Sequence, residues 1–234
     1  MLRAYLFLSV FVPFTFLCAT SALFWTLMDS SGRFYAFHAR LWSRFSLALV
    51  GIGVTIRGME HLPDGPIIFM SNHQSNFDIL ALLANMPRQI HWIAKKELFD
   101  IPVFGLSMRR GGYISLDRSD GRKALKSMDN AAAVIRAGKS VVLFPEGTRS
   151  RDLKLLPFKR GGFMLALRAG VPVLPITING SGRINPAGRT RIYRGNITIT
   201  LHPPLLPTTN VSREKAEIHL MEQVHRAISS ALEP

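Results

Sequence analysis

The sequence predicts an α/β fold, in which a mostly parallel or mixed sheet is flanked by helices and preceded by a helical N-terminal segment. From about residue 51, short apolar runs alternate with longer stretches of helical periodicity, the pattern of strands joined by helices. The chain has 234 residues, of which 47% are hydrophobic and 19% charged, and is therefore able to bury one sizeable core. No repeat, low-complexity segment or linker marks a second soluble domain, so we divide the chain into residues 1–50 and 51–234.

The first segment is predicted to be a membrane anchor. Residues 4–28 carry no formal charge and are rich in Phe and Leu. At ~1.5 Å per residue, a helix of this length spans a hydrocarbon core of ~30 Å with some tilt. A cleaved signal peptide is the main alternative, but the apolar run exceeds the usual ~7–15 residues and lacks a clear small-x-small cleavage site. We therefore favour an anchor that is retained.

Residues 33–54 have the pattern of an amphipathic helix. Apolar and aromatic side chains recur at three- and four-residue intervals, with Arg33, Arg40 and Arg44 among them. Such a basic helix is typical of the membrane interface, although a helix that packs its apolar face on the domain core has the same pattern. The two segments form either a hairpin in one leaflet or a span followed by a surface helix. The positive charge after the apolar run favours a domain on the cytoplasmic side of the inner membrane.

The remaining elements follow from apolar runs and their boundary residues. Predicted strands cover 54–57, 66–70, 90–94, 113–116, 141–144, 173–178 and 197–201. Predicted helices cover 77–86, a stretch from 97 that is broken around Pro102 and Gly105, 121–136, 158–168 and a C-terminal segment. Asp120 and Ser212 are suited to begin helices as N-caps, and Gly138 and Gly170 to end them. Residues 184–194, which contain three arginines, Pro186 and Gly188, are predicted to form a loop.

Charge and cysteine content narrow the classes of partner. A formal net charge of +14 and a pI of about 10.9 suit nucleic acid, an anionic membrane surface or an acidic small substrate. The single Cys18 excludes an intrachain disulfide and a Cys-rich metal site. Several histidines have no partner pattern, so we predict no metal site.

One polar cluster, Ser71 to Asp78, lies between the predicted strand 66–70 and the predicted helix 77–86. Such a turn, at the carboxyl end of a strand, is where open α/β sheets bind ligands. Within it, His73 and Asp78 are five residues apart and suit general-base chemistry, because a carboxylate on one ring nitrogen fixes the tautomer and stabilises the cation that forms. An ordinary histidine on a surface turn is the alternative from spacing alone.

A second strand, 141–144, also leads into a polar turn, which contains Arg149. Together, Asn72-His73-x-x-x-x-Asp78 (an HX4D motif) and Phe144-Pro145-Glu146-Gly147-Thr148-Arg149-Ser150 resemble the glycerolipid acyltransferase superfamily, enzymes that acylate lysophosphatidic acid and related lysolipids. Gly112 to Arg118 is similar to the family's second block and Val171 to Ile176 to its fourth. The resemblance runs from about Gly58 to about Asn179, and four blocks in order are a specific signal.

The resemblance implies that His73 is the general base and that Asp78 orients it, as the residues themselves suggest. No Gly-x-Ser-x-Gly elbow occurs, so a serine acyl-enzyme has no support. Cys18 lies deep in apolar sequence, so a cysteine acyl-enzyme has none either. Direct attack of an acceptor hydroxyl on a thioester remains. This chemistry needs neither a metal nor a cofactor beyond the acyl donor, which is acyl-coenzyme A or acyl carrier protein.

The acceptor phosphate needs cations. Arg149 is the first candidate because its guanidinium matches phosphate oxygens, followed by Arg118, Lys95 and then Lys96. The usual alternative for each is a solvated surface charge. These residues follow predicted strands, however, and strand ends should converge at one edge of the sheet.

The resemblance also implies that the turn Glu146-Gly147-Thr148-Arg149 binds the acceptor. Glu146 has two possible roles, a contact with an acceptor hydroxyl, which we favour, and an ion pair with an Arg. The helix that starts near Lys159 and Arg160 suits either the phosphates of the donor or an ordinary helix N-terminus.

Three functions remain open at this point. The first is a membrane-bound acyltransferase that makes phosphatidic acid from 1-acyl-sn-glycerol 3-phosphate, a step of phospholipid biosynthesis. The second uses the same chemistry on another acceptor, such as a lyso-ornithine lipid or a lysophospholipid. The third is a non-catalytic, membrane-tethered basic module. Nucleic acid is not an expected partner, because the aromatic and basic residues do not alternate as they do in single-strand binders.

Overall fold

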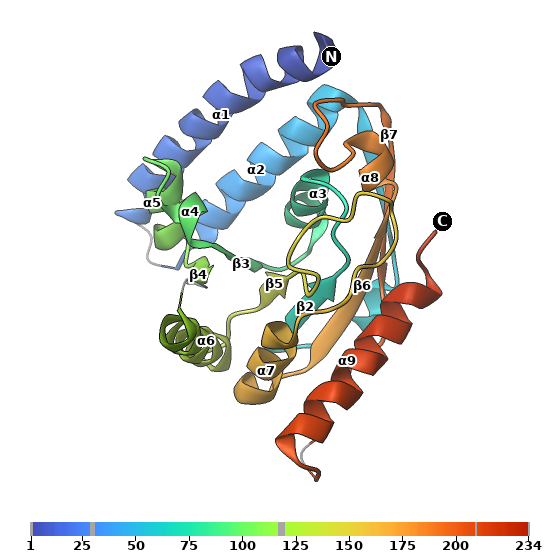
Figure 1. The fold of residues 1–234 in the computed structure, drawn as a ribbon. Coiled ribbons are helices and arrows are strands. Elements are labelled where there is room, and N and C mark those ends of the chain that lie inside the picture. Colours follow the sequence, from blue (N-terminus) through green and yellow to red (C-terminus); the bar gives the residue numbers. More distant parts are fainter. Residues whose placement is uncertain (1, 29–30, 117–119, 209, 234) are drawn as a thin grey trace.

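In the computed structural model, which describes residues 2–28, 31–116, 120–208 and 210–233, one seven-stranded sheet carries helices on both faces (Figure 1). The strands are β1 (Ile52–Arg57), β2 (Ile68–Ser71), β3 (His91–Lys95), β4 (Ile114–Leu116), β5 (Val141–Leu143), β6 (Val173–Asn179) and β7 (Gly195–Leu201). They lie in the order β1-β7-β6-β2-β5-β3-β4, and every neighbouring pair is parallel except β6 and β7. The predicted α/β class with a mixed sheet is therefore confirmed.

Helices form a layer on each face of the sheet (Figure 1). They are α1 (Leu2–Thr26), α2 (Arg33–Val50), α3 (Phe77–Asn85), α4 (Lys96–Phe99), α5 (Phe104–Arg110), α6 (Gly121–Arg136), α7 (Arg160–Ala169), α8 (Ser181–Ile184) and α9 (Arg213–Ser230), with a 3-10 turn at Met59–His61. One hydrophobic cluster joins α1, α2 and α3 to one face, and a second joins α6, α7 and α9 to the other.

The connections that leave β2 and β5 diverge at one edge of the sheet, and we call the place between the two turns that follow these strands the crevice. From β2 the chain passes through α3 to β3, whereas from β5 it passes through α7 to β6, in the opposite direction along the sheet. Right-handed crossovers that run in opposite directions place their helices on opposite faces, as observed here. The turns after two adjacent parallel strands therefore diverge, which is the arrangement at which open α/β sheets bind ligands.

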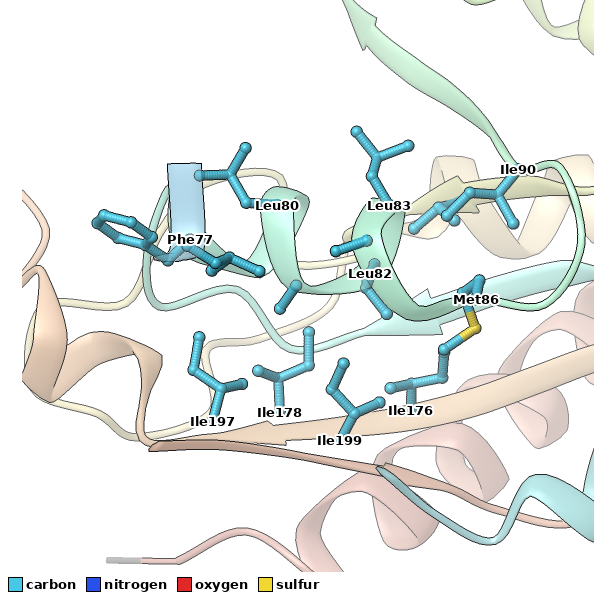
Figure 2. Close-up of a cluster of buried hydrophobic side chains, with 14 of the residues drawn as sticks. Phe77, Leu80, Leu82, Leu83, Met86, Ile90, Ile176, Ile178, Ile197 and Ile199 are labelled. Atoms are coloured by element: carbon cyan, nitrogen blue, oxygen red, sulfur yellow. The ribbon is translucent and has the colours of Figure 1, made fainter. Parts of the chain in front are cut away.

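The core under α3 holds this crevice in place. Figure 2 shows Leu82 of α3 pointing toward the isoleucines of β6 and β7, among them Ile178 and Ile199, whereas Leu80 and Leu83 lie on the other side of the helix. All residues of β2 are buried, because alternate side chains enter the two clusters on opposite faces. Burial of each large apolar side chain in the core between α3 and the sheet contributes about 1.5–3 kcal/mol, so α3 is held firmly on the sheet.

The helix predicted for residues 33–54 ends earlier, at Val50. Gly51 has a φ of 75°, and this left-handed conformation ends α2, so β1 starts at Ile52 instead of 54. Two of its arginines face the domain. Arg40 Nη2 donates to the Met86 carbonyl (2.8 Å) and Arg44 Nε donates to the Ala84 carbonyl (3.1 Å), at the C-terminus of α3. These contacts agree with the alternative in which the helix packs on the core.

The outer side of the N-terminal helices is apolar. Helix α1 is long and apolar enough to cross a membrane, judged by length and composition. It lies beside α2 (Figure 1), and much of its surface remains exposed. Large exposed apolar side chains on the two helices include Leu6, Leu17, Phe24, Phe37 and Leu41.

Most other predicted boundaries agree with the structure within a few residues. Asp120 and Ser212 accept hydrogen bonds from backbone N–H groups of the helices they begin, and Gly170 ends α7 with a φ of 66°. The predicted break between α4 and α5 falls at residues 100–103. A short helix, α8, leads into the loop predicted for 184–194 and ends at Ile184. The sequence did not indicate this helix.

Candidate active site

His73 lies in the turn between β2 and α3, at the crevice. Its Nδ1 is 2.8 Å from Asp78 Oδ2, and the side chains are 13% and 0% exposed. Since the carboxylate can only accept, Nδ1 carries the hydrogen and Nε2 keeps its lone pair in the neutral ring. The predicted pair is therefore in contact, with one ring nitrogen available as a base.

The five-residue spacing of this pair has a local structural cause. Asp78 lies in the first turn of α3, and its Oδ2 also accepts from the backbone N–H groups of Gln74 (2.8 Å) and Ser75 (2.9 Å). The carboxylate thus closes the turn that carries the histidine and lies at the positive end of the helix dipole. Its Oδ1 is buried without a hydrogen-bond partner among the described residues.

Side chains on either side of His73 attach the turn to the rest of the fold. The Asn72 amide donates to the Ile178 carbonyl (2.8 Å) and accepts from the Ile178 N–H (2.7 Å), which joins the turn to β6. Gln74 Nε2 donates to the Leu153 carbonyl (2.8 Å). The position of the imidazole is therefore set by contacts with distant parts of the chain.

The ring of His73 also stacks on Phe144, with centroids 3.8 Å apart and planes 4° apart. Phe144 in turn stacks on Trp92, with centroids 5.4 Å apart. The three rings follow the sheet order β2-β5-β3. From the sequence, Phe144 was identified only as part of a motif, and its contact with His73 was not predicted. The one available signal was an aromatic residue directly after a strand that leads into a polar turn.

Glu146 lies in the turn after β5 and is 1% exposed. Its Oε1 accepts from the His73 N–H (2.7 Å) and its Oε2 from the Leu156 N–H (3.0 Å). Burial raises the pKa of this carboxyl to about 7, the two N–H groups oppose the shift, and the negative charge of Asp78 adds to it. Both oxygens therefore face protein backbone, whereas the sequence had favoured an acceptor hydroxyl.

The rest of this turn lies beside His73. Gly147 has a φ of 70°, a conformation that favours glycine, and its N–H donates to the Phe144 carbonyl (3.0 Å). The Ser150 N–H donates to the His73 carbonyl (2.8 Å), so Arg149 is one residue from a direct backbone contact with the histidine. Thr148 is exposed and Arg149 is half-buried.

Lys95 and Lys96 lie at the end of β3, at the same edge of the sheet. Both are exposed. Arg118 lies outside the described residues, two positions after the end of β4, which is parallel to β3. The strand ends that carry the predicted cations therefore share one edge, as expected from a parallel sheet.

Lys159 adds a cation that the sequence left ambiguous. A Cβ at Gly147 would lie 3.0 Å from its Cδ and 3.2 Å from its Nζ, so the Lys159 chain runs along the Gly147 turn. Arg160 is engaged elsewhere, because its guanidinium pairs with both oxygens of Glu217 on α9 (2.6 and 3.2 Å). Of the two candidates at this helix start, Lys159 is the one beside the crevice.

Two other features lie outside the site. Within the described residues, no group of three or more His, Cys, Asp and Glu side chains is arranged to hold a metal ion. An open groove of about 530 Å³, lined in part by His91, Lys139 and Ser140, lies at the amino ends of β3 and β5. It is therefore at the edge of the sheet opposite His73.

Comparisons with known proteins give a consistent assignment. The family model described as Acyltransferase matches residues 53–179. The chain is 39% identical over 176 residues to the 1-acyl-sn-glycerol-3-phosphate acyltransferase BAT2, chloroplastic, of Brassica napus, which covers 74% of this chain and 51% of that protein. It is 33% identical over 190 residues to the 1-acyl-sn-glycerol-3-phosphate acyltransferase of Pseudomonas aeruginosa, over 79% of this chain and 73% of that protein.

A solved structure has the same fold. The crystal structure of the 1-acyl-sn-glycerophosphate (LPA) acyltransferase PlsC from Thermotoga maritima aligns with a TM-score of 0.82 at 25% identity, over 100% of this chain and 97% of that chain. The chain spans about half the length of the plant and algal relatives that it matches.

Proposed function

Because the chain belongs to the acyltransferase family, we propose that it is a membrane-bound enzyme that acylates 1-acyl-sn-glycerol 3-phosphate (lysophosphatidic acid) to phosphatidic acid. The contact of His73 with Asp78, 2.8 Å at the crevice of the sheet, is the observation that carries the proposal. The names of the relatives support the same acceptor. A non-catalytic basic module gives no role to this buried pair.

In the proposed reaction, His73 Nε2 takes the proton of the free acceptor hydroxyl as its oxygen attacks the thioester carbonyl. A carbon–oxygen bond forms, the carbon–sulfur bond breaks, and the imidazolium returns its proton to the thiolate that leaves. Asp78 stabilises the imidazolium between these steps. General-base assistance of this kind is worth about 10²–10⁴ in rate.

Cations at the same edge suit the acceptor phosphate. Arg149 is half-buried in the turn after β5, and its guanidinium suits phosphate oxygens. Lys159, along the Gly147 turn, and Lys95, at the end of β3, add positive charge at the same edge, and Arg118 follows β4 in the sequence. The donor is acyl-coenzyme A or acyl carrier protein, and the net charge of +14 favours either anionic partner without a separate cofactor.

The exposed apolar sides of α1 and α2 support the proposed membrane association. Both the acceptor and the product carry acyl chains that remain in a bilayer, so a site held at its surface needs no full extraction of the lipid into water. We place the enzyme at the inner membrane with domain 51–234 on the cytoplasmic side, in keeping with the positive charge that follows the apolar run.

The test is an assay with a labelled acyl donor, lysophosphatidic acid and lyso-ornithine lipid in parallel, on the full chain and on His73→Ala. We expect labelled phosphatidic acid from the unaltered chain and a loss of at least 100-fold in His73→Ala. Acylation of lyso-ornithine lipid alone would replace the acceptor. Equal activity of His73→Ala and the unaltered chain would overturn the proposed mechanism.

A further inference from the structure

The backbone of His73 is held on both sides by the turn after β5. Its N–H donates to Glu146 Oε1 (2.7 Å), and its carbonyl accepts from the Ser150 N–H (2.8 Å). The same turn carries Phe144, which stacks on the imidazole. One seven-residue segment, 144–150, therefore contacts the main chain and the ring of the proposed base.

Glu146 is poorly placed to contact a substrate. Its side chain is 1% exposed, and each carboxylate oxygen already accepts a backbone N–H, one from His73 and one from Leu156. An acceptor hydroxyl could only bind a remaining lone pair of this carboxylate, and at 1% exposure almost none of its surface is open to a substrate. The carboxylate instead joins the His73 turn to the chain at Leu156.

We infer that Glu146 is a positioning residue, whose carboxylate fixes the backbone of His73 and thereby aims Nε2 at the acceptor hydroxyl. This inference rests on the proposed function, because it takes His73 as the general base. It assigns Glu146 to the alignment of that base and not to acceptor binding. Asp78 orients the ring from Nδ1, Phe144 sets its plane, and Glu146 sets the main-chain position from which the ring projects.

The chemistry of the two donors explains why an amide is a poor replacement for the carboxylate. Two N–H groups converge on Glu146, and a carboxylate offers an acceptor to each. In Glu146→Gln the amide retains one acceptor and turns an NH₂ group toward the other N–H, so one bond is lost and two donors face each other. Glu146→Asp keeps both acceptors on an arm that is one methylene shorter.

These changes should act on turnover. A misplacement of about 1 Å can cost about 100-fold in rate, so we expect kcat to fall about 10- to 100-fold in Glu146→Gln, with the acceptor KM unchanged within about twofold. A residue that binds the acceptor equally in the ground and transition states would raise KM and leave kcat unchanged. The two roles therefore predict opposite kinetic patterns.

A matched control is available on the other face of the sheet. Glu217 is a carboxylate of similar burial, 3% exposed, and it is bound by Arg160. We expect Glu217→Gln to lose stability without a change in kcat, because it contacts neither His73 nor its turn. Unfolding temperatures of both variants separate a general loss of fold from a loss of alignment.

A double-mutant cycle completes the experiment, with the full chain in detergent or vesicles and lysophosphatidic acid as acceptor. If Glu146 acts through His73, Glu146→Gln has no further effect on the residual activity of His73→Ala. The milder Glu146→Asp repeats the cycle should the Gln variant fold poorly. Additive losses, or an acceptor KM that rises at constant kcat, would overturn the inference. A fully active His73→Ala would instead remove the proposed function.

Discussion

The imidazole of His73 lies flat on the ring of Phe144, with centroids 3.8 Å apart and planes 4° apart. The two residues are distant in sequence and meet because β2 and β5 are adjacent parallel strands that end at the same edge. A stacked neighbour restricts rotation of the ring about its χ2 angle, so it should help to keep Nε2 directed at the acceptor.

We expect Phe144→Leu to lower kcat/KM about three- to tenfold, because an aromatic contact of this kind is worth about 0.5–1.5 kcal/mol. Leu retains much of the apolar volume but offers no planar face. Phe163→Leu is a suitable control, since Phe163 is buried in the cluster on the opposite face. Steady-state kinetics on both variants make the comparison, and an equal loss in the two would argue against a role of the stack.

Asp78→Asn should abolish most of the activity while preserving the fold. The Asn oxygen can occupy the place of Oδ2 and accept the same three N–H groups, and its NH₂ group then takes the place of Oδ1, which has no partner among the described residues. What is lost is the negative charge that stabilises the imidazolium. We expect kcat to fall by about 10²–10⁴, with the unfolding temperature little changed.

Asp129→Asn controls for the loss of a carboxylate, since Asp129 is an exposed partner of Arg168 remote from the crevice. Its kcat should match that of the unaltered chain. An active Asp78→Asn variant would show that the carboxylate orients the ring without contributing its charge.

Gly147→Ala should weaken acceptor binding and cost stability. A residue with a side chain is strained at a φ of 70°, and the added Cβ would lie 3.0 Å from Lys159, which would have to move. The strain alone costs on the order of 1–2 kcal/mol. If Lys159 contacts the acceptor phosphate, its displacement should also raise the acceptor KM several-fold.

Gly170→Ala separates the two effects. Gly170 has a φ of 66°, but a Cβ there would meet no atom within 4 Å, and the residue ends α7 away from His73. The unfolding temperature of Gly170→Ala should fall about as much as that of Gly147→Ala, with an unchanged acceptor KM. A KM that stays constant in Gly147→Ala would argue against a contact between Lys159 and the acceptor phosphate.

Much of the fold was predictable because its central strands β2, β5 and β6 are buried on both faces. Runs such as 141–144 and 173–178 are almost wholly apolar and are followed by Pro145 and Asn179, which sets their type and approximate length. The order of the strands was not predictable, nor was the antiparallel β7, because these depend on contacts between residues far apart in the chain. The four-residue helix α8 is too short to show a period.

The site divides in the same way. His73 and Asp78 were identifiable because their contact is local and closes a single turn. The direction of Glu146 was not, since an acidic residue in a polar turn has the same sequence whether it faces a ligand or the backbone of a neighbouring turn. Only the adjacency of β2 and β5 directs its carboxylate toward His73. The inward direction of Arg40 and Arg44 likewise depends on where α3 ends.

The raised pKa of Glu146 predicts a pH dependence of stability. In the folded chain this carboxyl has a pKa of about 7, above its ordinary value of 4.5, because burial disfavours the charged form. Between these two pH values the folded state binds more protons than the unfolded state. The contribution of the Glu146 carboxyl to the free energy of unfolding is therefore full below pH 4.5 and declines as the pH rises to about 7.

Glu146→Gln removes this titration and serves as the reference. The free energy of unfolding of the unaltered chain, minus that of Glu146→Gln, should fall with a slope on the order of 1 kcal/mol per pH unit near the middle of the window and level off above it. Denaturant unfolding of both proteins from pH 4.5 to 8 measures the difference. A difference that is constant, or that grows with pH, would mean that the two N–H bonds outweigh burial and that Glu146 is ionised throughout this range.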